Sequence, residues 1–180
     1  VLAACACCYS LGIPVHAIKI GIEEIKPFPG RLEAISAVKG ATVIDDSYNA
    51  NPASVKAAIE VLAATAGSTY LVLGDMGELG SSGAQLHRAI GEFAKSKNIQ
   101  KVYALGDLSQ QTVTAFGPGA EHFSSHAELL SALLQDLSVG QDPSANILVK
   151  GSRSMSMEQI VMGLLMTDEQ ALDETQEGRC

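Results

Sequence analysis

The chain has 180 residues, of which 47% are hydrophobic and 18% are charged, which is typical of one globular domain rather than a disordered chain or a coiled coil. Twelve Lys and Arg against twenty Asp and Glu give a net charge of −8. This balance argues against nucleic acid and membranes as partners, so any phosphate contact has to be local. No apolar run in the sequence is long enough to span a bilayer.

The apolar, Ala-rich segment Val1–Leu11 predicts a helix that ends before Pro14. Because it has neither an initiating Met nor a positively charged start, we expect it to be the end of a helix cut from a larger protein. Its residues Cys5, Cys7 and Cys8 have no nearby His cluster that would complete a zinc site. We expect them to be small residues on a buried helix face, and an unpaired cluster favours the reducing cytoplasm.

Pro27, Pro29 and Gly30 indicate a linker or domain boundary over Ile18–Gly30. After it, Arg31–Val38 and Ala41–Asp45 are predicted to form a β-hairpin around Lys39-Gly40. From there, short apolar runs alternate with segments of helical periodicity. The expected strands are Ala41–Ile44, Thr69–Leu73, Lys101–Leu105, Glu121–Phe123 and Ala145–Val149. The expected helices are Pro52–Ala66, Ser82–Asn98, Ser109–Phe116, Ala127–Leu137 and Met157–Met166.

This alternation predicts an α/β fold: a Rossmann-like, doubly wound, mostly parallel sheet with helices on both faces. The strand within Arg31–Val38 is expected to add antiparallel at one edge. In such a sheet, ligands bind beyond the carboxyl ends of the strands. Three unusual polar segments follow predicted strands and are therefore candidates for a site.

The first polar segment is DDSYNANP, Asp45 to Pro52. Helix capping explains Asn51 before Pro52, but it does not explain Asp46, Tyr48 and Asn49. Two adjacent carboxylates at a strand end also need a cation or a hydrogen-bond donor. The segment therefore indicates a functional site.

The other two segments carry weaker signals by themselves. The glycines of GDMGELG, Gly74–Gly80, permit a close backbone approach and positive φ angles, but the segment is equally consistent with a plain turn. In KGSRS, Lys150–Ser154, two cations in an acidic chain indicate a carboxylate or phosphate partner, against the alternative of a solvated loop. Arg31 is ambiguous from spacing, and His87 is expected to be a surface or half-buried helical residue.

Taken together, these segments resemble the C-terminal domain of the Mur ligases, particularly the members that add a D-Ala-D-Ala dipeptide. The resemblance runs from about Gly30 to Leu165 and includes the sequences GRLE, IDDSYNANPAS, GDMGELG and VKGSRSMSME. It implies an ATP-dependent amide ligase that extends UDP-N-acetylmuramoyl-tripeptide through an acyl phosphate, in cytoplasmic peptidoglycan precursor synthesis. It also implies that residues 1–28 are a remnant of the central ATPase domain plus linker, 29–167 the C-terminal domain, and 168–180 a flexible acidic tail.

The resemblance assigns roles to residues that match the family's motifs. Those implied to contact the nucleotide are Arg31, Asp46 and Tyr48. Those implied to face the dipeptide are Asn49, Asn51, Asp75, Met76, Glu78, Ser152 and Arg153. No catalytic and no metal-binding residue is expected in this chain.

One departure from the family's full pattern is the absence of a G-x-x-x-x-G-K-[ST] phosphate loop from the sequence. We therefore expect the chain alone to be inactive and to bind no cofactor tightly, with ATP and Mg²⁺ held in the full-length enzyme. Its expected partners are its own central and N-terminal domains, the UDP-linked tripeptide and D-Ala-D-Ala, with closure about a hinge near Pro27–Gly30. The alternatives are a Mur ligase of different amino-acid specificity and a non-catalytic, Rossmann-like ligand-binding module.

Overall fold

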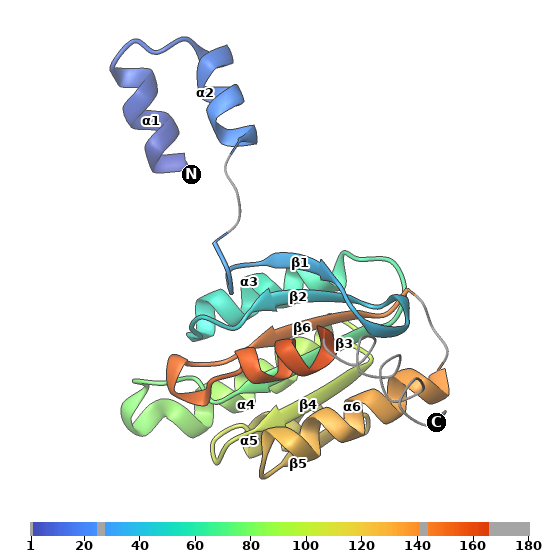
Figure 1. The fold of residues 1–180 in the computed structure, drawn as a ribbon. Coiled ribbons are helices and arrows are strands. Elements are labelled where there is room, and N and C mark those ends of the chain that lie inside the picture. Colours follow the sequence, from blue (N-terminus) through green and yellow to red (C-terminus); the bar gives the residue numbers. More distant parts are fainter. Residues whose placement is uncertain (1, 25–27, 141–143, 166–180) are drawn as a thin grey trace, which may run out of the picture.

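The computed structural model describes residues 2–24, 28–140 and 144–165. Its centre is a six-stranded sheet with the strand order β1-β2-β6-β3-β4-β5, shown in Figure 1. The expected acidic tail, residues 168–180, and residues 25–27 of the expected linker and hinge lie outside the described residues.

The strands confirm the predicted mostly parallel sheet with one antiparallel edge. β1 pairs antiparallel with β2, and the other neighbouring strands pair in parallel. A short 3₁₀ turn, η1 (Val38–Gly40), lies between β1 and β2, with Lys39 at a φ of 58°. The strand bounds are β1 (Glu33–Ser36), β2 (Thr42–Asp46), β3 (Thr69–Gly74), β4 (Lys101–Leu105), β5 (Ala120–Phe123) and β6 (Asn146–Lys150).

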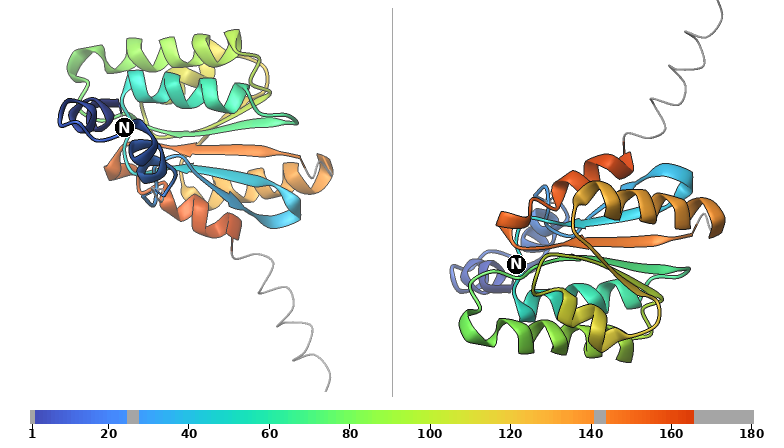
Figure 2. Two further views of the ribbon diagram at one scale, coloured as in Figure 1. Left: turned by 90° about the horizontal axis from the view of Figure 1, so that it is seen from above. Right: turned by 90° about the horizontal axis from the view of Figure 1, so that it is seen from below.

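The helices cover both faces of the sheet, as the doubly wound prediction requires (Figure 2). On one face lie α3 (Pro52–Ala63), α4 (Gly83–Ser96) and α5 (Gln110–Phe116), and on the other α6 (His126–Gly140) and the helical residues 158–165. Side chains that alternate along each strand fill two separate cores. Ile44, Leu71 and Leu148 pack in the core under α3 and α4. Val43, Val72 and Ile147 pack on the α6 side.

The N-terminal region differs from the prediction in two ways. After α1 (Leu2–Ser10), residues Val15–Glu23 form a second helix, α2, where a linker was expected from Ile18 onward. The signal for α2 is the helical spacing of Val15, Ile18 and Ile22, which the later prolines outweighed. The predicted buried cysteine face is also wrong, because neither α1 nor α2 has a buried residue and Cys7 is exposed. None of the described helices is long and apolar enough to cross a membrane.

A partly exposed ion pair and a hydrogen bond stabilise the contact between β4 and α6. The phenol of Tyr103, which is 1% exposed, donates to Oδ2 of Asp136, and Nζ of Lys101 donates to the same oxygen. Burial and the neighbouring carboxylate raise the pKa of Tyr103. Burial also acts to raise the pKa of Asp136, but the hydrogen bonds from Lys101 and Tyr103 outweigh it and hold that pKa below its ordinary value.

We predict that Asp136 stabilises the fold in a pH-dependent way. Because its folded pKa lies below the ordinary value of 3.8, its contribution is present above that pH and is lost as the pH falls. Asp136→Asn should lower the free energy of unfolding by about 1 kcal/mol at pH 7 and by less at pH 3, measured by urea denaturation. Asp107→Asn, which alters an exposed carboxylate, is the matched control. A deficit that stays constant between the two pH values would contradict this prediction.

Candidate functional site

The three polar segments come together at one edge of the sheet, the carboxyl rim, defined by the ends of β2, β6 and β3. β6 lies between β2 and β3, so its end is beside both neighbours. Because β1 runs antiparallel to β2, the residues before β1 also lie at this rim, and Glu33 pairs with Asp45. The strand order and register therefore bring the segments that contain Arg31, Asp46, Asp75 and Arg153 to one rim.

The cation that the paired carboxylates require is Lys150. Asp46 and Lys150 are partners in the register of β2 and β6, and Nζ of Lys150 lies 2.5 Å from Oδ2 of Asp46. The same ammonium donates to the carbonyl oxygen of Asn49 at 2.8 Å. Asp45 is satisfied separately, since its Oδ1 accepts the backbone N–H of Ser47 at 3.0 Å. The anionic partner predicted for the KGSRS cations is, for Lys150, a carboxylate of the same chain.

Asn51 caps α3, as expected from Asn-Pro. Its Oδ1 accepts the backbone N–H of Ser54 at 2.9 Å, and Oγ of Ser54 accepts the N–H of Asn51 at 3.1 Å. Asn49 folds its Oδ1 onto the N–H of Ala50 at 2.8 Å. Both side chains thus shape the turn from β2 into α3, and both line the two pockets described next.

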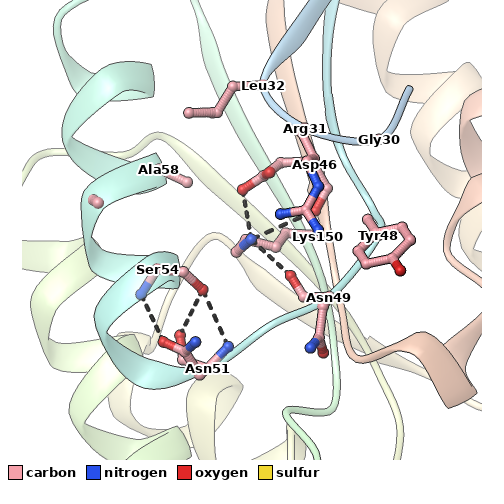
Figure 3. Close-up of a pocket in the computed structure, with 11 residues that line it drawn as sticks. Gly30, Arg31, Leu32, Asp46, Tyr48, Asn49, Asn51, Ser54, Ala58 and Lys150 are labelled. Carbon is pink, nitrogen blue, oxygen red and sulfur yellow. Dashed lines mark hydrogen bonds and ion pairs between the residues drawn. The ribbon is translucent and has the colours of Figure 1, made fainter. Parts of the chain in front are cut away.

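The first pocket, the Asp46 pocket, has a volume of about 370 Å³ and lies between the turn before β1 and the start of α3 (Figure 3). The guanidinium of Arg31 stacks on the ring of Tyr48, 4.4 Å from its centroid. The charged residues that line the Asp46 pocket are Arg31, Asp46 and Lys150. Because Asp46 and Lys150 neutralise each other, and Arg31 forms no ion pair within the described residues, the pocket has a net positive charge in an acidic chain.

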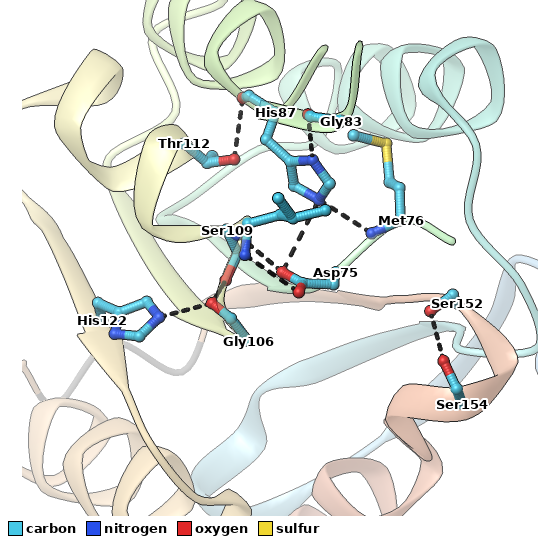
Figure 4. Close-up of polar contacts among 11 residues, drawn as sticks. Asp75, Met76, Gly83, His87, Gly106, Ser109, Thr112, His122, Ser152 and Ser154 are labelled. Carbon is cyan, nitrogen blue, oxygen red and sulfur yellow. Dashed lines mark hydrogen bonds and ion pairs between the residues drawn. The ribbon is translucent and has the colours of Figure 1, made fainter. Parts of the chain in front are cut away.

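The GDMGELG segment is held in place by buried and partly buried hydrogen bonds (Figure 4). Asp75 accepts the backbone N–H of Ser109 at 2.7 Å and that of Leu108 at 3.1 Å, so its carboxylate fixes the start of α5. His87 is fully buried, and its Nε2 accepts the N–H of Met76 at 3.0 Å while Nδ1 lies 2.8 Å from the carbonyl of Gly83. Met76 is 1% exposed, and its side chain belongs to the core.

Two glycines of these segments are required by close packing. A Cβ at Gly151 would lie 2.5 Å from Cγ of Met157, and one at Gly74 would lie 2.8 Å from its Sδ. Gly80 has a positive φ of 55°, as the motif suggested, but Glu78 also does, at 60°. The backbone N–H of Ser152 donates to the carbonyl of Asp75 at 2.9 Å, which joins the second and third segments directly.

The second pocket, the Arg153 pocket, adjoins the first and has a volume of about 410 Å³. Its lining residues are Asn49, Ala50, Asn51, Gly77, Glu78, Leu79, Ser152, Arg153 and Ser154. Glu78 is exposed, and Arg153 has a side chain 65% exposed that pairs with Glu158 at 3.0 Å. The pocket therefore presents one anionic and one cationic side chain at its edges. Asp75 and Met76 are not among its lining residues.

Two features at the carboxyl ends of the strands were not predicted from the sequence. Lys150 was recognised only as part of a basic motif, because its partner lies 104 residues away. A third pocket of about 270 Å³ follows β4 and β5 and includes His122 and His126. Each imidazole Nε2 lies 2.7 Å from a backbone carbonyl, that of Gly106 or of Met155, so both rings tie loops together. No sequence motif marked this pocket.

Comparison with known proteins gives a consistent result. The model of the family "Mur ligase, glutamate ligase domain" matches residues 30–153. Proteins named UDP-N-acetylmuramoyl-tripeptide–D-alanyl-D-alanine ligase from Escherichia coli and Bacillus subtilis are 42% and 33% identical to the chain, each over 91% of it. The chain spans about 35% of the length of the Escherichia coli protein and 36% of the Bacillus subtilis protein.

Solved structures agree in fold. A crystal structure of MurF from Acinetobacter baumannii superimposes with a TM-score of 0.83 at 33% identity, covering 90% of this chain and 35% of that one. A MurF ligase from Thermotoga maritima in complex with ADP shares the fold, with a TM-score of 0.69 at 23% identity over 78% of this chain and 31% of that one. Because the family model matches more than half of the chain and a relative is 42% identical over 91% of the chain, this chain belongs to the Mur ligase family.

Proposed function

We propose that this chain acts as the C-terminal domain of an ATP-dependent ligase that joins D-alanyl-D-alanine to UDP-N-acetylmuramoyl-tripeptide in the cytoplasm. The observation that carries the proposal is the convergence of three separate segments on two adjoining pockets that share Asn49 and Asn51. A relative 42% identical over 91% of the chain bears the name of that ligase. Because the chain spans 35% of that relative, the remaining parts of the site would come from other domains.

The Asp46 pocket suits the nucleotide. Arg31 supplies the net positive charge for phosphate oxygens, and Tyr48 holds the guanidinium in place. Asp46 has Oδ2 paired with Lys150, whereas its Oδ1 accepts no hydrogen bond from the described residues, so it can accept one from a ribose hydroxyl. Residues 2–165 excluding 25–27 and 141–143 contain no cluster of three His, Cys, Asp or Glu that could hold a metal ion. In this proposal, Mg²⁺ accompanies ATP and is held in the full-length enzyme.

The Arg153 pocket suits a zwitterionic dipeptide. The guanidinium of Arg153 can bind its carboxylate, and the carboxylate of Glu78 can bind its ammonium group. Ser152, with its Oγ 3.1 Å from that of Ser154, adds hydroxyls at the same wall. Asp75 is less suited to this role because both of its oxygens accept backbone N–H groups.

In the proposed reaction, a carboxylate oxygen of the tripeptide takes the γ-phosphoryl group of ATP and ADP leaves. The dipeptide amine then attacks the acyl carbon, phosphate leaves, and the amine loses a proton as the amide bond forms. This chain binds and orients the substrates. Arg31 pairs with the phosphate oxygens of ATP, and the Arg153 pocket holds the dipeptide so that its amine can attack. The sequence has no phosphate loop. In this proposal, the chain therefore completes an active site whose phosphate-binding loop lies in another domain. A stand-alone binding module would instead bind ATP or D-Ala-D-Ala tightly without other domains, which calorimetry measures.

We predict that a chimaera of the preceding part of the Escherichia coli relative with this chain ligates D-Ala-D-Ala to the UDP-linked tripeptide. In it, Arg31→Ala should raise the KM for ATP about 10- to 100-fold, because a charged contact to phosphate is lost. Arg88→Ala, which breaks an exposed ion pair with Glu92, is the control. A folded, inactive chimaera, or turnover by this chain alone, would refute the proposal.

We predict that substitutions of the two acidic residues of GDMGELG affect different properties: one the KM for the dipeptide, the other the stability of the chain. Glu78→Gln should raise the KM for D-Ala-D-Ala about tenfold and leave the stability of the chain unchanged, because the exposed carboxylate has no structural partner among the described residues. Asp75→Asn should lower the free energy of unfolding by about 1–2 kcal/mol, because the start of α5 loses its anionic acceptor. Steady-state kinetics and thermal unfolding measure the two effects. The reverse pattern would exchange the roles of the two residues.

A further inference from the structure

We propose that Lys150 is a positioning residue for the ligase site: its buried ammonium fixes the Asp46 carboxylate for the nucleotide and joins the two pockets. This inference rests on the function proposed above. The side chain of Lys150 is 3% exposed, and that of Asp46 is 14% exposed. A lysine buried this far is stable only when its charge is paired with an opposite charge and its N–H groups donate hydrogen bonds. Both conditions are met within the rim.

The donors of Lys150 reach the last residue of β2 and one residue of the segment that follows it. Nζ lies 2.5 Å from Oδ2 of Asp46 and 2.8 Å from the carbonyl oxygen of Asn49 (Figure 3). With Oδ2 occupied, the carboxylate of Asp46 cannot rotate freely, and Oδ1 remains as the acceptor at the pocket. Lys150 therefore fixes the orientation in which the Asp46 carboxylate meets the pocket.

Lys150 also sets the charge of the Asp46 pocket. Without the ammonium of Lys150, Asp46 would have an unpaired negative charge beside the position proposed for a triphosphate. That charge would cancel the positive charge of Arg31 in the pocket. With the pair intact, the positive charge of Arg31 is the net charge that the described lining residues offer to an anion. Selectivity for the nucleotide thus depends on a residue that does not need to touch it.

The backbone of Lys150 connects this pocket to the Arg153 pocket. Two residues further along the chain, the N–H of Ser152 donates to the carbonyl of Asp75 at 2.9 Å. On the other side, the Asn49 carbonyl held by Nζ belongs to a residue that lines both pockets. One short segment, Lys150 to Ser152, is therefore bonded to the ends of both β2 and β3 and fixes the spacing of the two pockets.

The test uses the active chimaera described above. Lys150→Met keeps the length of the side chain and removes the charge, so the KM for ATP should rise about tenfold or more. Lys101→Met is the matched control, because Lys101 also pairs with an aspartate, Asp136, but on the α6 side of the sheet, away from both pockets. The control should lower thermal stability and leave the KM for ATP within twofold.

A second set of variants separates positioning from a structural role and remains informative if Lys150→Met folds poorly. In an Asp46→Asn background no buried carboxylate is left unpaired, so the double variant should fold. If Lys150 acts through Asp46, Lys150→Met should change the KM for ATP less than twofold in that background. Equal effects in both backgrounds, or an unchanged KM in the single variant, would overturn the inference. An inactive parent chimaera would instead count against the proposed function.

Discussion

The candidate site depends on the position of β6, the last strand in the sequence, between β2 and β3. Because of this insertion, one segment makes contacts with both neighbours: the ammonium of Lys150 with Asp46, and the N–H of Ser152 with the carbonyl of Asp75. The helix after β2 covers one face of the sheet, and the helical residues 158–165 cover the other. Such a change of face opens a crevice at the strand ends, and here both pockets lie in it.

Charge placement at the rim explains how an acidic chain can offer an anion site. The chain carries a net charge of −8, yet the Asp46 pocket is positive because a buried ion pair cancels one carboxylate and leaves Arg31 uncompensated. The pair itself contributes little net stability, since the desolvation of two charges offsets most of their attraction. Its value lies in orientation, because it holds the Asp46 carboxylate in one position at the pocket.

The polar residues at the rim fall into two groups that residue type alone does not separate. Asp75 and His87 are occupied by backbone groups of the chain, and they hold the loops in place. Arg31, Glu78 and Arg153 lie at pocket surfaces, with charged groups that are open or only paired at the surface. An aspartate that fixes the start of a helix and a glutamate that faces a pocket carry the same charge. Only their hydrogen-bond partners distinguish a scaffold from a binding surface.

Features that depend on neighbouring residues could be predicted along the chain: the alternation of strands and helices, the cap of α3 by Asn51, and the polar segments after the strands. Local periodicity and capping involve residues a few positions apart, so they can be read along the chain. The helix α2 was not predicted, because the prolines that follow it were interpreted as the sign of a linker despite its helical periodicity. The contact of Lys150 with Asp46, 104 residues away, and the hydrogen bonds of Asp75 to the start of α5 rather than to a pocket emerge only from the folded chain. Those contacts follow from strand order and register, which bring together residues that no local pattern connects.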